Sequence, residues 1–167
     1  MFLQFLALSA VKKYITMKQF ENVDDILDFA INEEQMAVDF YSELAENAKT
    51  DDMKIVFSEF AEEEIKHKMS LMKIKEEGFY TLEKEQVADL KIGDYVVNVK
   101  ATTTMTYEEA LVLAMKKEKS AFKLYLALSE RAPNAGLKDL FLGLAQEESK
   151  HKLRFEIEYD EFVLREN

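Results

Sequence analysis

The sequence predicts an all-α four-helix bundle made of two helical hairpins that repeat one another. Of its 167 residues, 48% are hydrophobic and 33% are charged, and only four Gly and one Pro interrupt them, a composition that suits long helices. A shift of 84 residues lays one half of the chain over the other. Within each half, apolar residues recur at alternating spacings of three and four, the period of a helix face.

The internal repeat is clearest in one eight-residue segment. Ala61–Lys68 and Ala145–Lys152 are identical at six of eight positions. The same shift places Glu34 on Glu118 and Tyr41 on Tyr125, so the repeat extends well beyond that segment. Each half therefore predicts one helical hairpin, and two hairpins give four helices.

Capping signals place the first hairpin at residues 22–78. Asn22 or Asp24 can cap a first helix that runs to about Lys49. Thr50, followed by two aspartates, can cap a second helix that ends near Gly78, because glycine readily adopts the left-handed conformation that terminates helices.

The second hairpin is predicted at residues 106–163, within a bundle domain of residues 22–167. Thr106 and Glu109 have the spacing of a capping box that opens the third helix. The Pro, Asn and Gly at residues 133–136 mark the turn into the fourth helix, expected to run to about Phe162.

Two segments lie outside the predicted hairpins. Residues 79–105 are expected to form a long crossover between the second and third helices, with a weakly signalled edge strand at Tyr95–Val99. A connection of this length could also let hairpins exchange between two chains. Residues 1–21 form an N-terminal extension. Its apolar start, Met1–Leu8, is too short to span a bilayer, and is either a short packing helix or the product of an upstream start codon before Met17.

The predicted core face of the first and third helices carries a glutamate at its middle. Both faces read Leu, Ala, Glu, Ala, Tyr, Leu, Ala, and every position is identical between them. The stripes are Leu27, Ala30, Glu34, Ala37, Tyr41, Leu44 and Ala48, and Leu111, Ala114, Glu118, Ala121, Tyr125, Leu128 and Ala132. Since spacings of three and four keep residues on one face, Glu34 and Glu118 are expected to point inward.

The second and fourth helices each add a glutamate and a histidine to the core. Their stripes have spacings of four, three and four: Phe60, Glu64, His67 and Leu71, and Leu144, Glu148, His151 and Phe155. Glu and His three residues apart lie side by side on one helix face. The chain has only two histidines, and both fall in this motif.

Four buried carboxylates require compensation, because burying unpaired charges costs several kcal/mol each and like charges repel. Two divalent cations would balance four glutamates, while neutral imidazoles coordinate without adding charge. Oxygen and nitrogen ligands suit iron, with manganese as the alternative metal. The sequence therefore predicts a two-metal site held by six residues: Glu34, Glu64, His67, Glu118, Glu148 and His151.

Two less specific interpretations remain beside this one. The acids and histidines could instead form a metal-free hydrogen-bond network that fixes the packing of a structural bundle.

Tyr41 and Tyr125 lie two turns from Glu34 and Glu118, and could donate hydrogen bonds to metal-bound carboxylates on facing helices. They could equally be ordinary core aromatics with an anchored hydroxyl.

Composition excludes several other classes of function. A net charge of -11 argues against a nucleic-acid or anionic-membrane partner, since both are bound through clustered Lys and Arg. Cysteine is absent, which excludes disulfides, thiolate nucleophiles, structural zinc fingers and Cys-ligated iron–sulfur centres. We expect a cytoplasmic protein.

Glu34, Glu64-x-x-His67, Glu118 and Glu148-x-x-His151 together resemble the rubrerythrin branch of the ferritin-like di-iron superfamily, over about residues 22–163. The resemblance implies a ferritin-like bundle, two iron ions bridged by Glu64 and Glu148, and reduction of hydrogen peroxide or dioxygen. It also implies that Glu34, Glu64, Glu118 and Glu148 act in catalysis through the metal, and we expect a homodimer.

The sequence departs from typical rubrerythrins in two ways. They carry a C-terminal rubredoxin domain with Cys-bound iron, whereas this chain has no cysteine, so electrons are expected from a separate donor protein such as a rubredoxin. They also carry an extra glutamate one turn after the third-helix ligand, linked to iron movement during peroxide reduction, where this chain has Ala121. The remaining six-ligand set is equally similar to bacterioferritin and other ferroxidases, so an iron-handling protein is the alternative function.

Overall fold

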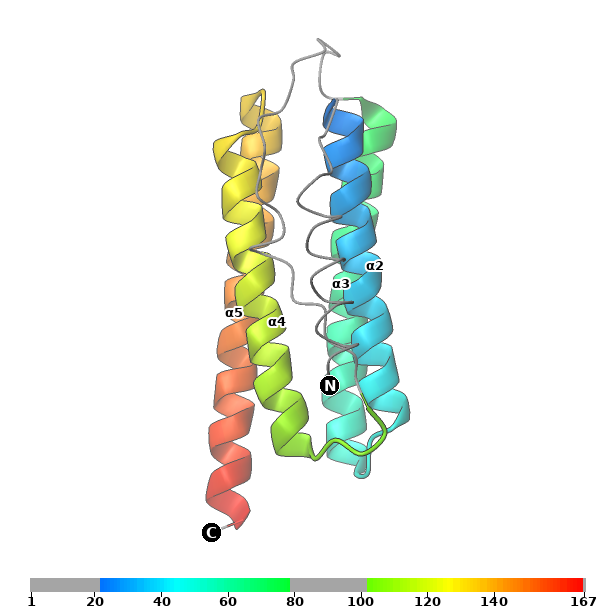
Figure 1. The fold of residues 1–167 in the computed structure, drawn as a ribbon, viewed down its shortest axis with the longest axis vertical. Coiled ribbons are helices and arrows are strands. Elements are labelled where there is room, and N and C mark those ends of the chain that lie inside the picture. The colour runs from blue at the N-terminus through cyan, green and yellow to red at the C-terminus, as the bar shows by residue number, and fades with distance from the viewer. Residues whose placement is uncertain (1–21, 79–101, 167) are drawn as a thin grey trace, which may run out of the picture.

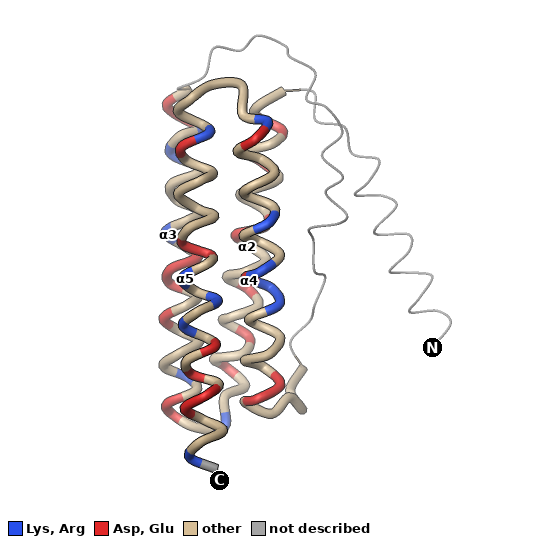
Figure 2. The backbone as a smooth tube through the Cα atoms, turned by 90° about the vertical axis from the view of Figure 1, so that its left-hand side faces the viewer, with Lys and Arg blue, Asp and Glu red and all other residues tan. Residues whose placement is uncertain are grey.

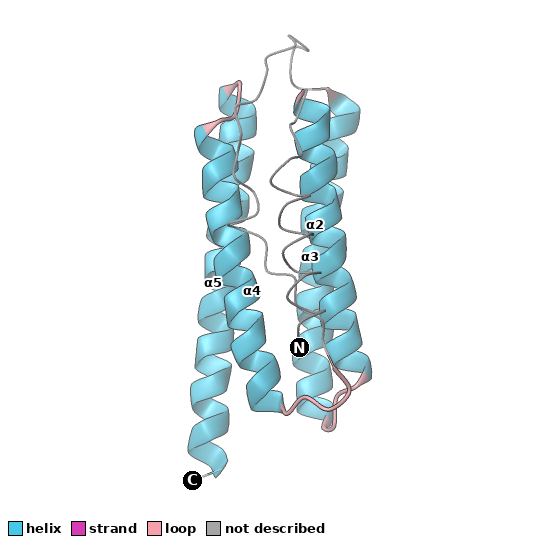
Figure 3. Ribbon diagram, viewed as in Figure 1, coloured by secondary structure: helices cyan, strands magenta, loops and turns pink. Residues whose placement is uncertain are grey.

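The computed structural model describes residues 22–78 and 102–166, and all the regular secondary structure in these ranges is helical (Figures 1 and 3). The helices are α2 (Val23–Glu46), α3 (Asp51–Glu77), α4 (Tyr107–Glu130) and α5 (Ala135–Glu166). The predicted all-α four-helix bundle is therefore confirmed. The N-terminal extension, most of the predicted crossover and the predicted strand at 95–99 lie outside the described residues.

The two hairpins stand side by side, with α2 beside α4 and α3 beside α5. Tyr41 of α2 reaches Glu118 of α4, and Arg154 of α5 pairs with Glu59 of α3. Figure 1 shows that α3 ends and α4 begins at opposite ends of the bundle. The second and third helices are therefore parallel, as a crossover between the hairpins requires.

The predicted N-caps of the first hairpin are present. The Asn22 side chain accepts a hydrogen bond from the Asp25 amide at 3.0 Å, and the Thr50 hydroxyl accepts one from the Met53 amide at 3.2 Å. Gly78 ends α3 with a left-handed φ of 59°, which a residue with a Cβ rarely adopts. Local sequence signals therefore determine these helix boundaries.

The predicted capping box opens the second hairpin. The Thr106 hydroxyl accepts from the Glu109 amide at 3.1 Å, while the Glu109 carboxylate accepts from the Thr106 amide at 2.9 Å. The turn into α5 is capped by Asn134, whose side chain accepts from the Leu137 amide at 2.9 Å. These bonds satisfy amides that a helix leaves free in its first turn.

Two helix ends differ from the predictions. α2 ends at Glu46, before the expected Lys49, because Asn47 turns back and donates to the Glu43 carbonyl from both its amide and its side chain. α5 continues past Phe162 to Glu166, with an Arg165–Glu161 ion pair of 3.4 Å along its last turn. Helix ends are the parts of a helix that local sequence signals define least sharply.

The buried apolar residues form two clusters. One contains residues 23–30 of α2 and the start of α5, and the other contains residues 37–45 of α2 and the start of α4. The stripe position at residue 34 falls between them, so a polar layer separates two apolar cores. Charged residues are spread along all four helices (Figure 2), and none of the described helices is apolar enough over its length to cross a membrane.

Candidate metal centre

All six predicted site residues lie in the polar layer at the middle of the bundle. Each helix contributes at least one, because the stripe positions face the bundle axis. Their exposed fractions are 3% for Glu34, 1% for Glu64, 9% for His67, 1% for Glu118, 2% for Glu148 and 3% for His151. Four carboxylates at this depth are rare without charge partners.

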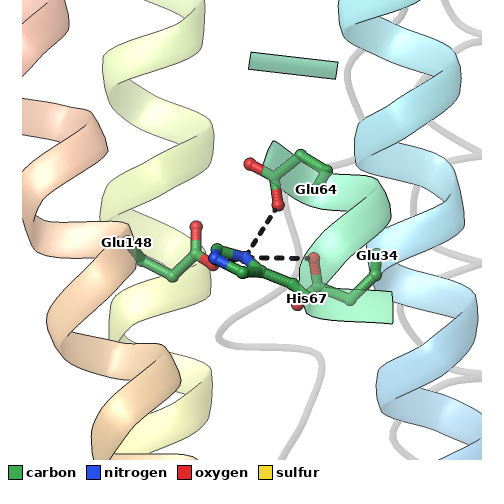
Figure 4. Close-up of side chains that lie close together, drawn as sticks. All are labelled: Glu34, Glu64, His67 and Glu148. Carbon is green, nitrogen blue, oxygen red and sulfur yellow. Dashed lines mark ion pairs between the residues drawn. The ribbon is translucent and has the colours of Figure 1, made fainter. Parts of the chain in front are cut away.

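The six residues form two overlapping groups. One contains Glu34, Glu64, His67 and Glu148, and the other contains Glu64, Glu118, Glu148 and His151. Within each group, one candidate ligand atom from every residue lies within 4.8 Å of the others. Glu64 and Glu148 belong to both groups and come from opposite hairpins. Figure 4 shows the first group, with the His67 ring between Glu64, Glu34 and Glu148.

The facing nitrogen and carboxylate oxygen atoms lie within ion-pair distance of one another. Nδ1 of His67 lies 3.1 Å from a Glu148 oxygen and 3.2 Å from a Glu64 oxygen, and Nδ1 of His151 lies 3.2 Å from the other Glu64 oxygen. The buried atoms without a hydrogen-bond partner are both oxygens of Glu64, one oxygen each of Glu118 and Glu148, and Nδ1 of both histidines.

This pattern fits bound metal ions better than a hydrogen-bond network. A buried polar atom without a partner costs about 1–3 kcal/mol, and six of them gather at one point. Together with Glu34, the residues that carry these atoms form the two groups of candidate ligand atoms described above, as ligands gather around cations. Oxygen and nitrogen atoms in these numbers suit divalent iron or manganese.

When no metal is bound, protons on the site's carboxylates and imidazoles must supply part of the positive charge that the metal ions would bring. Burial raises the pKa of Glu34 to about 8, and burial together with Glu64 raises the pKa of Glu148 well above its usual range. For His67, burial lowers the pKa, but the Glu34 and Glu64 carboxylates outweigh it and raise the value to about 10. Metal ions would displace these protons, because only deprotonated carboxylates and neutral imidazoles coordinate.

The two tyrosines bind glutamates of the opposite hairpin. The Tyr41 hydroxyl donates to Glu118, and the Tyr125 hydroxyl donates to Glu34. Burial and nearby carboxylates raise both tyrosine pKa values well above 10, so the hydroxyls stay protonated donors at neutral pH. Each hydroxyl therefore fixes the orientation of one carboxylate.

A cavity of about 30 Å³ reaches the glutamates from the side of α2 and α4. Glu33, Lys117, Ser120 and Ala121 line it together with the glutamates. Ala121 is half-buried, whereas the equivalent Ala37 is buried. Neither Glu33 nor Lys117 was predicted as part of the site. The signal that could have identified them is their equivalence under the shift of 84, directly before Glu34 and Glu118.

Two further neighbours of the site were also not predicted. Glu63 lies 2.6 Å from Nε2 of His151, and Arg154 lies 3.4 Å from the other Glu63 oxygen. In the sequence, Glu63 is one of three consecutive glutamates. Helical spacing puts it at the edge of the core face and Glu62 on the opposite side, but does not show which residue Glu63 meets. Only the packing of α3 against α5 brings it to the histidine.

The comparisons with known proteins agree with this geometry. The family model for rubrerythrin matches residues 25–159. A hypothetical protein from Pyrococcus furiosus has 28% sequence identity and a TM-score of 0.60, over 80% of this chain and 85% of that chain. No curated protein is significantly similar to the chain. With the family model covering all six site residues, the chain belongs to the rubrerythrin family.

Proposed function

We propose that this protein is a non-haem di-iron oxidoreductase that reduces hydrogen peroxide or dioxygen. The observation that carries the proposal is the convergence of six buried ligand atoms that have no hydrogen-bond partner. The five residues that carry these atoms, together with Glu34, form two overlapping groups. Both groups contain Glu64 and Glu148, an arrangement that suits two ions side by side. Membership of a family of di-iron proteins favours iron over manganese.

The residues of the chain would hold the ions and keep the site dry. Glu34 and His67 would bind one ion, Glu118 and His151 the other, and Glu64 and Glu148 would contact both. Tyr41 and Tyr125 would hold Glu118 and Glu34 through their hydroxyls. The buried rings of Phe60 and Phe155 are stacked, with 3.8 Å between their centroids, and exclude water on one side of the six candidate ligands.

The size of the cavity supports a small substrate. A volume of about 30 Å³ has room for about two water-sized molecules, so peroxide or dioxygen is a better match than an organic substrate. Ferrous iron bound at the site would supply one electron per ion to the O–O bond. A separate protein such as a rubredoxin would return the electrons, and we expect a cytoplasmic homodimer.

The test is anaerobic loading with Fe²⁺, metal quantification, and stopped-flow mixing with peroxide and with dioxygen. Two irons per chain and rapid oxidation by either oxidant are expected. The matched variant Glu148→Ala removes a shared ligand and should abolish the reaction. If the loaded wild-type protein is oxidised by neither reagent at a rate above that of free Fe²⁺, the redox proposal is wrong.

A ferroxidase or iron-handling protein is the second candidate, and the cavity favours it in one respect. The small side chain of Ala121 leaves the cavity that reaches the glutamates open. The carboxylate of Glu33 also lines this cavity and could attract Fe²⁺. An iron-handling protein would oxidise many Fe²⁺ ions per chain and retain the product. Iron-to-protein ratios above two, with an assembly much larger than a dimer on size-exclusion chromatography, would favour this function.

A further inference from the structure

The outer nitrogen of His151 has a carboxylate partner from the other hairpin. Nδ1 of His151 faces Glu64 in the centre of the site, and Nε2 faces away from it. Oε2 of Glu63, on α3, lies 2.6 Å from that Nε2. The imidazole is thus held between a candidate metal position on one side and a carboxylate on the other.

Arg154 holds Glu63 in this position. Its guanidinium lies 3.4 Å from the second oxygen of Glu63 and pairs with Glu59 one turn earlier on α3. The guanidinium carbon also lies 4.7 Å from the centre of the Phe60 ring, which in turn contacts the edge of His151 at 5.2 Å between ring centres. Two acids and one aromatic ring therefore contact the same guanidinium, which lies beside Glu63.

The equivalent histidine has no such support. The shift of 84 places Glu147 at the position of Glu63, but Glu147 pairs with Lys150 of its own helix at 2.7 Å. Ser70 stands where the other hairpin has Arg154. Among the residues that the structure describes, none forms a hydrogen bond with Nε2 of His67, and His67 is 9% exposed against 3% for His151.

We propose that Glu63, held by Arg154, is a positioning residue that makes the two metal positions unequal. A carboxylate that accepts the Nε2–H bond keeps the proton on Nε2, directs the Nδ1 lone pair at the metal, and makes that nitrogen a stronger donor. The position at His151 therefore binds a divalent ion first, and the position at His67 fills second. This inference rests on the metal-binding function proposed above.

The experiment is a titration of the metal-free protein with Co²⁺, followed by its d–d absorption and by calorimetry. Wild-type protein should bind two ions in two steps of different affinity. Glu63→Ala should weaken the tighter step by roughly 10–100-fold, the usual cost of losing a partner of a ligating histidine. Glu147→Ala is the matched control at the equivalent position and should leave both steps unchanged.

Two more variants separate positioning from general stability. Glu63→Gln keeps an oxygen that can accept the Nε2–H bond and should recover part of the lost affinity. Arg154→Met leaves Glu63 in place, and should weaken the same step by a smaller factor. Arg154→Met also carries the test if Glu63→Ala does not fold.

Three results would overturn the inference alone: two equal sites in wild-type protein, an unchanged tighter step in Glu63→Ala, or equal effects of Glu63→Ala and Glu147→Ala. Wild-type protein that binds no Co²⁺, Mn²⁺ or Fe²⁺ would overturn the proposed function as well. The two failures are therefore distinguishable by the wild-type titration.

Discussion

The α2–α3 hairpin and the α4–α5 hairpin carry equivalent candidate ligands at the bundle axis. The residues that flank these ligands differ between the two hairpins. Glu34 and Glu118 each accept a hydrogen bond from a tyrosine of the opposite hairpin, and each lies in one candidate metal group. Glu63 contacts Nε2 of His151, whereas the equivalent Glu147 pairs with Lys150 of its own helix. The inner layer is symmetric and the layer around it is not.

This difference shows that an internal repeat need not give two equal sites. The position of a ligand on its helix face decides whether it can reach an ion. The residues on the flanks of the same helices decide how firmly the ligand is held and which groups reach it from outside. Glu33 and Lys117 illustrate the second effect, since equivalent positions beside the cavity carry opposite charges.

The largest expected effect is on metal content, and it tests the symmetry of the inner layer. Glu64→Ala and Glu148→Ala should each remove both ions, because these residues belong to both groups. Glu34→Ala and Glu118→Ala should each leave one ion per chain. Plasma mass spectrometry after reconstitution gives the ratio. Retention of one ion in Glu64→Ala would show that the two positions do not share this ligand.

The two apolar cores should respond equally to the loss of a buried ring. Phe57 and Phe141 are equivalent under the repeat and are 0% and 1% exposed. Phe57→Ala and Phe141→Ala should each reduce the free energy of unfolding by about 3–5 kcal/mol. Urea titrations measure this, with the exposed Leu153→Ala as control, expected to change it by less than about 0.5 kcal/mol. Unequal losses would show that one hairpin end dominates stability.

The metal-free protein should lose stability as the pH rises. The folded pKa is about 8 for Glu34 and about 10 for both histidines, against 4.5 and 6.5 for the unstructured groups. The folded state therefore holds more protons than the unfolded state between pH 4.5 and 10, so its stability falls across that range.

Calorimetric scans of the metal-free protein should show a Tm lower by roughly 5 °C or more at pH 9 than at pH 6, allowing about 1.4 kcal/mol per pKa unit and 2–4 °C per kcal/mol. His67→Gln and His151→Gln should each remove a similar share of this dependence. Metal-loaded protein is the control and should vary less. A Tm that rises with pH in the metal-free protein would contradict the assignment of protons.

The smallest effect concerns the turns of the two hairpins. Thr50 and Asn134 are equivalent and each caps the second helix of its hairpin, through bonds of 3.2 and 2.9 Å. Thr50→Ala and Asn134→Ala should each cost about 1 kcal/mol in urea unfolding. Thr50→Ser keeps the hydroxyl and should cost little. If both alanine variants unfold like the wild-type protein, the caps do not stabilise these turns.

Much of the fold could be predicted because its signals are local. Asn22, Thr50, Thr106 and Gly78 act on helices next to them in sequence, and the structure uses all four as predicted. The inward orientation of the six site residues followed from helical spacing. Their meeting point followed from the repeat, which aligns Glu34 with Glu118 and Glu64 with Glu148.

The features of the site that were not predicted depend on the rotation and spacing of the two hairpins relative to each other. No local sequence pattern indicates that rotation or spacing. Ala37 and Ala121 hold the same position in two identical stripes, yet Ala37 is buried and Ala121 is half-buried beside the cavity. The contact between Glu63 and His151 joins α3 to α5 across 88 residues of chain. Helical spacing assigns Glu63 to the edge of its face, and only the position of the neighbouring helix turns that edge into part of the site.

The sharing of Glu64 and Glu148 between both groups has a mechanical consequence. An ion held by both residues would join the two halves of the chain at mid-length, as a disulfide does in proteins that contain cysteine, which this one lacks. Unlike a disulfide, this metal cross-link could be removed by a chelator. Binding and removal of the metal would then control how easily the two hairpins separate. A protease should cut the metal-free form faster than the metal-loaded form.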